Sequence, residues 1–118
     1  MSSKGFDTLI ASSKKKNRYL RNYMQITSKV GKIIKHKYKG TKVYVFGSTV
    51  RGSYTASSDI DLLVVLPQSL DLNERAKLRA MVFMKFPDAP LELHIVNEKE
   101  FKDWYLRFIK SDELVEVL

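Results

Sequence analysis

An apolar run near the middle of the chain limits the folds that it can adopt. Residues 59–66 read Asp-Ile-Asp-Leu-Leu-Val-Val-Leu, so polar and apolar residues alternate at first and an unbroken apolar stretch follows. Such a run is typical of a strand at the centre of a sheet, buried on both faces. Pro67 ends the run, because proline cannot donate the backbone hydrogen bond that a central strand needs. We therefore expect a sheet built around residues 59–66.

Shorter patterned segments on either side supply neighbours for this strand. Residues 42–46 are β-branched and aromatic and end at Gly47, whereas residues 91–96 alternate between apolar and polar. Both patterns predict strands. Apolar residues at helical spacing predict helices over residues 14–40, over residues 71–86 and from residue 97 onward. These elements indicate an α/β fold: a small mixed sheet with helices packed on one face and acidic side chains on the other.

The length of the chain fits one domain, residues 1–118, with a core of its own. Residues 1–13 are small, polar and aperiodic, and we expect them to be flexible and unstructured. The helix predicted over residues 14–40 is basic and ends at Gly40. Residues 111–118 have no decisive pattern.

Composition excludes several classes of protein. The chain contains no cysteine, which removes disulfide frameworks, thiolate zinc or iron–sulfur sites and cysteine nucleophiles. No apolar run reaches the roughly 18 residues of a membrane span, and the first residues lack the features of a signal peptide. We therefore expect a cytoplasmic protein without membrane contact.

Charge is distributed unevenly along the chain. The 21 basic and 13 acidic residues give a net charge of +8. Residues 1–42 hold 12 of the basic residues and a single acid, Asp7. Three interpretations of this basic segment stay open: contact with RNA or DNA, docking of an acidic protein, or a solvated helix surface.

The segment between the first two predicted strands carries the candidate chemistry. Gly47 permits a sharp turn in which backbone N–H groups and the Ser48 hydroxyl can face an anion, as in a phosphate site. On a strand, Asp59 and Asp61 would lie on one face, about 6.6 Å apart along the chain. Two such carboxylates repel each other without a cation, and hard oxygen ligands favour Mg²⁺ or Mn²⁺ over Zn²⁺. The pattern therefore indicates a nucleoside triphosphate site.

The order of these residues resembles a known family. Gly-Ser, a ten-residue spacer, Asp-x-Asp and an acid on a later strand are similar to the signature of the DNA polymerase β-like nucleotidyltransferases, and the short chain resembles their minimal type. The resemblance covers residues 43–96. It implies that Asp59, Asp61 and Glu92 are catalytic and hold two Mg²⁺ or Mn²⁺ ions. It also implies that the phosphates are bound by Gly47, Ser48 and Arg51.

The resemblance further implies transfer of a nucleoside monophosphate, above all AMP from ATP, to an acceptor hydroxyl on a protein or an RNA. Minimal nucleotidyltransferases often accompany a helical HEPN-domain protein in toxin–antitoxin pairs. The expected partner is therefore such a protein or a second copy of the chain, and the expected role is that of the antitoxin. Two other functions stay open: a non-catalytic module that binds a partner, and a nucleic-acid-binding protein that uses the basic helix.

Two histidines are the remaining candidates for the site. His94 lies two residues after Glu92 on the same predicted strand face, where a general base or a ligand is conceivable. A hydrogen-bonded structural histidine is the more common case, and we place His94 outside the site. His36 lies in the basic helix and is expected at the surface.

Overall fold

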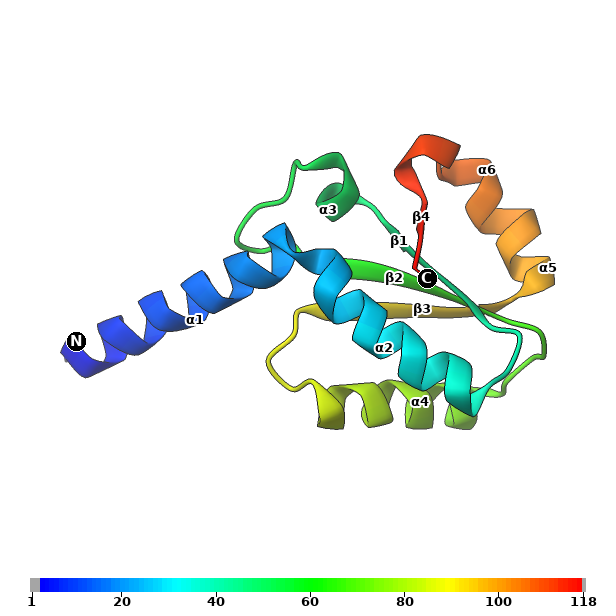
Figure 1. The fold of residues 1–118 in the computed structure, drawn as a ribbon, viewed down its shortest axis with the longest axis horizontal. Helices are drawn as coiled ribbons and strands as arrows, with labels where there is room; N and C mark the ends of the chain where they lie inside the picture. Colours follow the sequence, from blue (N-terminus) through cyan, green and yellow to red (C-terminus); the bar gives the residue numbers. More distant parts are fainter. Residues whose placement is uncertain (1–2, 118) are drawn as a thin grey trace.

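The computed structural model describes residues 3–117 (Figure 1). Its elements follow in the order α1 (Ser3–Arg21), α2 (Tyr23–Lys37), β1 (Lys42–Phe46), α3 (Ser48–Arg51), β2 (Ile60–Leu66), α4 (Leu72–Lys85), β3 (Leu91–Asn97), α5 (Glu98–Glu100), α6 (Leu106–Phe108) and β4 (Val115–Glu116). A π-helical stretch, Phe101–Tyr105, joins α5 to α6, and we call residues 98–108 the C-terminal helical segment. A 3₁₀ turn, Ser111–Glu113, precedes β4.

The four strands form one mixed sheet in the order β3-β2-β1-β4 (Figure 1). β2 lies in the interior, antiparallel to β1 and parallel to β3, as its apolar sequence predicts. The register sets Phe46 opposite Asp61 on one side and Glu92 beside Asp61 on the other. The last residue of β1 and the first residues of β2 and β3 therefore meet at one place. The predicted fold class, a small mixed sheet in an α/β protein, is confirmed.

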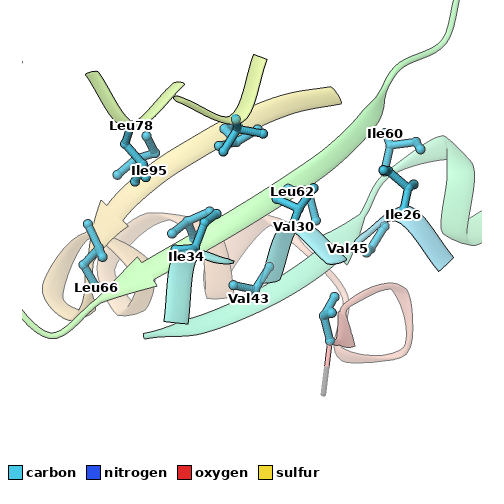
Figure 2. Close-up of a cluster of buried hydrophobic side chains, with 14 of the residues drawn as sticks. Ile26, Val30, Ile34, Val43, Val45, Ile60, Leu62, Leu66, Leu78 and Ile95 are labelled. Atoms are coloured by element: carbon cyan, nitrogen blue, oxygen red, sulfur yellow. The ribbon is translucent and has the colours of Figure 1, made fainter. Parts of the chain in front are cut away.

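Helices α2 and α4 cover one face of the sheet, where the main hydrophobic core lies (Figure 2). Val30 and Ile34 of α2 are fully buried, and Leu78 and Val82 of α4 are nearly so. Burying an apolar side chain of this size contributes about 1.5–3 kcal/mol relative to leaving it exposed. The helices contact strand residues that alternate along the sequence, among them Val43, Val45, Leu62, Val64, Leu93 and Ile95.

Side-chain caps fix where two helices begin. The Asp71 carboxylate accepts a hydrogen bond from the Glu74 backbone N–H at 2.8 Å, so α4 begins where the sequence predicts. Asn97 and Glu100 form a reciprocal capping box at the start of the C-terminal helical segment. The hydrogen bonds of this capping box therefore fix the direction in which the chain leaves β3.

The opposite face of the sheet carries the acidic residues and a second, smaller core. Leu63, Val65 and Val96 are buried there under the C-terminal helical segment, with Phe101 packed against them. The Phe101 ring stacks on Tyr44 of β1, with ring centroids 5.4 Å apart. This segment thus covers part of the acidic face, and the acids lie toward the end where the three strands meet.

The N-terminal region differs from the prediction in two ways. Residues 3–13 were expected to be unstructured but belong to α1, which extends away from the sheet; residues 1–2 lie outside the described part (Figure 1). A helix that is already nucleated propagates at little cost, which explains how α1 continues through a polar segment. The single helix predicted over residues 14–40 is interrupted at Asn22, whose backbone leaves the helical conformation with φ −110° and ψ 41°. α2 then ends at Lys37, before Gly40.

Within residues 3–117, no helix combines the length and the apolar character that crossing a bilayer requires.

Candidate active site

The turn after β1 brings its backbone against the first site carboxylate. Gly47 has φ +85° and ψ −156°, a conformation that side-chain-bearing residues rarely adopt. A Cβ atom placed on Gly47 would lie 2.6 Å from Asp61 Oδ2. Only glycine can therefore form this turn while Asp61 keeps its position. Ser48 follows as the first residue of α3 and is partly exposed.

Asp61, Glu92 and His94 form a compact cluster at the start of β2 and β3. His94 Nε2 lies 3.3 Å from Asp61 Oδ1 and 3.8 Å from Glu92 Oε1. One ligand atom from each residue lies within 4.8 Å of the other two. The Asp61 and His94 side chains are about one quarter exposed, whereas the Glu92 side chain is 58% exposed. The cluster is therefore open to solvent on the Glu92 side.

Aromatic side chains support His94 from behind. The Tyr105 hydroxyl lies 3.5 Å from His94 Nδ1, the nitrogen that faces away from the carboxylates. The Phe46 ring packs against His94 and Tyr105, with centroid distances of 5.1 and 6.2 Å. Burial, and next the negative charge of Glu100, raises the pKa of Tyr105 above its usual range, so the phenol keeps its proton near neutral pH. Tyr105 and Phe46 together hold the imidazole with Nε2 toward Asp61.

The remaining predicted acid, Asp59, lies outside this cluster. Its carboxylate Oδ1 is 3.8 Å from Lys16 Nζ of α1, and its side chain is 48% exposed. Its backbone carbonyl accepts a hydrogen bond from the Thr49 hydroxyl at 3.3 Å. The structure thus brings together two of the three predicted acids, Asp61 and Glu92, and directs the third toward a lysine.

Arg51, the basic residue predicted beside the phosphates, lies at the end of α3. Its Nη1 is 3.5 Å from Glu113 Oε2, so the guanidinium is directed toward the turn before β4. The ion pair is half-exposed, and exposed pairs of this kind contribute about 0–1 kcal/mol. Such a weak pair leaves the side chain free to turn toward a bound anion.

His94 is the residue that the sequence interpretation left out. The alternation of β3 had placed it on the same face as Glu92, but its contact with Asp61 depends on the pairing of β2 with β3. Register between strands follows from the whole sheet, so the contact could not be derived from β3 alone.

The donor atoms of the cluster suit a divalent cation. Ligands at neighbouring octahedral positions around an ion such as Mg²⁺ lie about 3 Å apart. The distances from His94 Nε2 to Asp61 Oδ1 and to Glu92 Oε1 are slightly longer, at 3.3 and 3.8 Å. Two carboxylates that face one space fit a hard cation, and the turn at Gly47 places backbone next to them.

Comparison with known proteins identifies the family. Residues 27–117 match the family described as the nucleotidyltransferase domain. The match includes β1, β2 and β3 and all the residues of the cluster. The chain therefore belongs to the nucleotidyltransferase domain family.

Two relatives differ in how much of their length corresponds to this chain. Spectinomycin 9-adenylyltransferase of Staphylococcus aureus is 39% identical over 69 residues, which are 52% of this chain and 26% of that enzyme. The chain thus corresponds to about a quarter of that relative. A Methanocaldococcus jannaschii protein named "Putative protein adenylyltransferase MJ1379" is 26% identical over 98 residues, covering 83% of this chain and 97% of that protein.

Two solved structures share the fold. One, titled "Crystal structure of putative nucleotidyltransferase", has a TM-score of 0.63 and 30% identity, covering 78% of this chain and 97% of that one. The other, from Sulfolobus solfataricus, has a TM-score of 0.59 and 20% identity, covering 89% and 85%. The architecture described above is therefore that of nucleotidyltransferases.

Proposed function

We propose that this protein transfers AMP from ATP to a hydroxyl group of a protein, in a reaction that depends on Mg²⁺ or Mn²⁺. The observation that carries the proposal is the convergence of Asp61 and Glu92 on neighbouring parallel strands, beside the tight turn at Gly47. In the family, this is the arrangement expected for a triphosphate and its cation. The acceptor oxygen attacks the α-phosphorus, and pyrophosphate leaves.

Each residue of the site has a role in this proposal. The backbone at Gly47 and the hydroxyl of Ser48 bind the β and γ phosphates, with Arg51 turning toward them from Glu113. Asp61 and Glu92 hold the divalent cations, and Asp59 joins them by rotating away from Lys16. The cations neutralise phosphate charge and lower the pKa of the acceptor hydroxyl. His94 orients the Asp61 carboxylate through the 3.3 Å contact.

The choice of donor and acceptor rests on the relatives. Both are named adenylyltransferases, which supports ATP as the donor. The Methanocaldococcus jannaschii relative, matched over nearly its whole length, is named for a protein acceptor. From the family resemblance we further propose a helical HEPN-type protein as partner, with this chain as the antitoxin.

A second candidate function is nucleic-acid binding through the basic face of α1 and α2. Lys29 and Lys32 are among the basic residues of α2, and Lys14 to Lys16 are in α1. Part of this charge is used internally, because Lys16 lies near Asp59 and Lys35 donates a hydrogen bond to the Val117 carbonyl. Binding by this face should weaken steeply with salt and survive loss of Asp61, which distinguishes it from the proposed transfer.

The proposal is tested by following label from [α-³²P]ATP into three acceptor pools: the chain itself, bacterial protein and bacterial RNA. We expect label in protein when Mg²⁺ or Mn²⁺ is present. Asp61→Asn and Glu92→Gln should lower transfer by about 100-fold or more, as loss of transition-state charge stabilisation does. Asp103→Asn, a change of an exposed acid on the C-terminal helical segment, serves as the matched control. Full transfer by Asp61→Asn would overturn the proposal, and label in RNA alone would overturn the protein acceptor.

A further inference from the structure

A groove follows the outer edge of β3 and includes two residues of the acidic cluster in its lining. It encloses about 930 Å³ between α4 and the C-terminal helical segment. Phe83 of α4 and Phe86, the residue after this helix, line one wall, and Trp104 and Phe108 line the other. Glu92 and His94 belong to the same lining, so the groove opens directly onto the candidate active site.

Large aromatic side chains at the groove are unusually exposed. Phe83, Trp104 and Phe108 are 65%, 64% and 75% exposed. The rings of Trp104 and Phe108 lie 6.0 Å apart and tilt toward each other by 30°, so they form one apolar surface. Contiguous apolar surface of this kind marks a binding site, since a folded protein seldom leaves it facing water.

The arginines of the groove are already engaged. Arg75 donates hydrogen bonds to the carbonyls of Leu70 and Ile95, at 2.9 and 3.0 Å, and pairs with Glu100 at 3.1 Å. Arg79 donates to the Leu93 carbonyl at 3.3 Å, also at the outer edge of β3. All three side-chain nitrogens of Arg75 are therefore occupied within the chain, which leaves this guanidinium poorly placed to bind phosphates of a nucleic acid, whereas Arg79 uses only its Nε in this way.

The charges of the lining also balance. Arg75 and Arg79 are matched by Glu92 and Glu100, and the remaining wall is largely apolar. A polyanion such as RNA and a strongly cationic small molecule would each meet groups of like charge. Aromatic side chains beside arginines, in contrast, are the composition that protein interfaces favour.

We propose that this groove binds the acceptor as a segment of polypeptide with apolar side chains. The apolar side chains lie between Phe83 and the Trp104–Phe108 surface, and the residue that carries the acceptor hydroxyl lies at the Glu92 end. The statement that the bound polypeptide accepts AMP rests on the proposed function, whereas the statement that the groove binds a polypeptide does not.

Trp104 makes the binding measurable without catalysis. It is the only tryptophan in the sequence, and its exposure to water will fall when the groove is filled. The experiment titrates the protein with synthetic peptides that lack tryptophan and carry a central Tyr, Ser or Thr. In one series this residue is flanked by Leu and Phe, in a second by Glu and in a third by Lys. A single-stranded RNA oligonucleotide is titrated in parallel. We expect a blue shift of Trp104 emission with the Leu/Phe-flanked peptides.

Matched variants assign the shift to the groove. Phe83→Ala and Phe108→Ala should each weaken peptide binding about fivefold or more, as loss of a central interface aromatic does. The controls are Met84→Ala and Leu106→Ala, which change exposed apolar residues outside the groove lining and should stay within about twofold of the wild type.

Four outcomes would overturn the proposal: no shift of Trp104 emission with any peptide, equally weakened peptide binding in the control variants, an emission shift with RNA only, or an emission shift when the protein concentration alone is raised. The last outcome would assign the groove to a second copy of the chain. Asp61→Asn should bind the peptides as the wild type does. Peptide binding without transfer of AMP to the bound peptide would contradict the proposed function and leave the groove assignment in place.

Discussion

Replacing Gly47 by alanine tests the geometry on which the site depends. The substitution adds one methyl group at the turn after β1 and leaves the charges of the site unchanged. That methyl group would occupy a point 2.6 Å from Asp61 Oδ2, closer than non-bonded atoms approach. Either the turn or the carboxylate must move, and the carboxylate is the softer of the two because it is the end of a side chain.

The substitution is expected to lower both the free energy of unfolding, through backbone strain, and the affinity for ATP with Mg²⁺, through displacement of Asp61. Holding alanine at φ +85° and ψ −156° costs about 1–3 kcal/mol, because this region is almost restricted to glycine. For a chain of this size, that loss lowers the Tm by roughly 5–15 °C. Displacement of Asp61 also removes its contact with His94, so binding of ATP with Mg²⁺ should fall more than stability alone explains.

Gly52→Ala is the matched control for this experiment. Gly52 also has a positive φ, +72°, but a Cβ atom there would meet nothing within 4 Å. Its replacement costs about 1–2 kcal/mol of backbone strain without touching Asp61. Thermal unfolding by circular dichroism gives the stability of both variants, and calorimetric titration with ATP and Mg²⁺ gives the affinity. The reasoning is refuted if both variants bind ATP equally well, or if Gly47→Ala binds as the wild type does.

Two further predictions concern parts of the fold outside the acidic cluster. Arg75→Met removes a guanidinium that donates hydrogen bonds to three acceptors, and it should lower the free energy of unfolding, measured in urea, by about 1–3 kcal/mol. Lys77→Met changes an exposed residue of the same helix and should stay near the wild type. Equal effects of the two substitutions would contradict the role of Arg75. Burial raises the pKa of Tyr44 and Tyr105, so the unfolded chain loses these phenol protons first and the folded protein should lose stability as the pH rises above about 10. A Tyr44→Phe, Tyr105→Phe double variant should show a shallower alkaline decline in urea unfolding series, and an unchanged decline would contradict this origin.

Most of the sheet could be predicted because its strands carry their own patterns. The apolar run that became β2 and the alternating β3 each indicate a strand and the side on which its polar residues lie. The placement of Asp61 beside Glu92 then follows from pairing two such strands. The two-residue strand β4 could not be predicted, since Val115–Glu116 is too short to show alternation and is defined only by its pairing with β1.

The parts of the site that escaped prediction depend on contacts between distant segments. Asp59 belongs to the same sequence pattern as Asp61, yet its side chain lies toward Lys16, more than forty positions earlier in the chain. Likewise, Tyr105 reaches His94 only because the C-terminal helical segment folds back over the sheet. Local periodicity contains no information on such contacts, whereas the turn glycine and the acids can be identified from their residue types in the sequence.

Thermal unfolding in the presence of ATP alone, Mg²⁺ alone and both together tests the central claim most directly, namely that Asp61 belongs to a site for a metal-bound nucleotide. Ligand binding to the folded state raises the free energy of unfolding by about 2.7 kcal/mol when the ligand is at 100 times its Kd. We predict a rise in Tm of several degrees for the wild type that requires both ligands and is absent in Asp61→Asn. No rise in the wild type with both ligands, or the same rise in Asp61→Asn, would contradict the account.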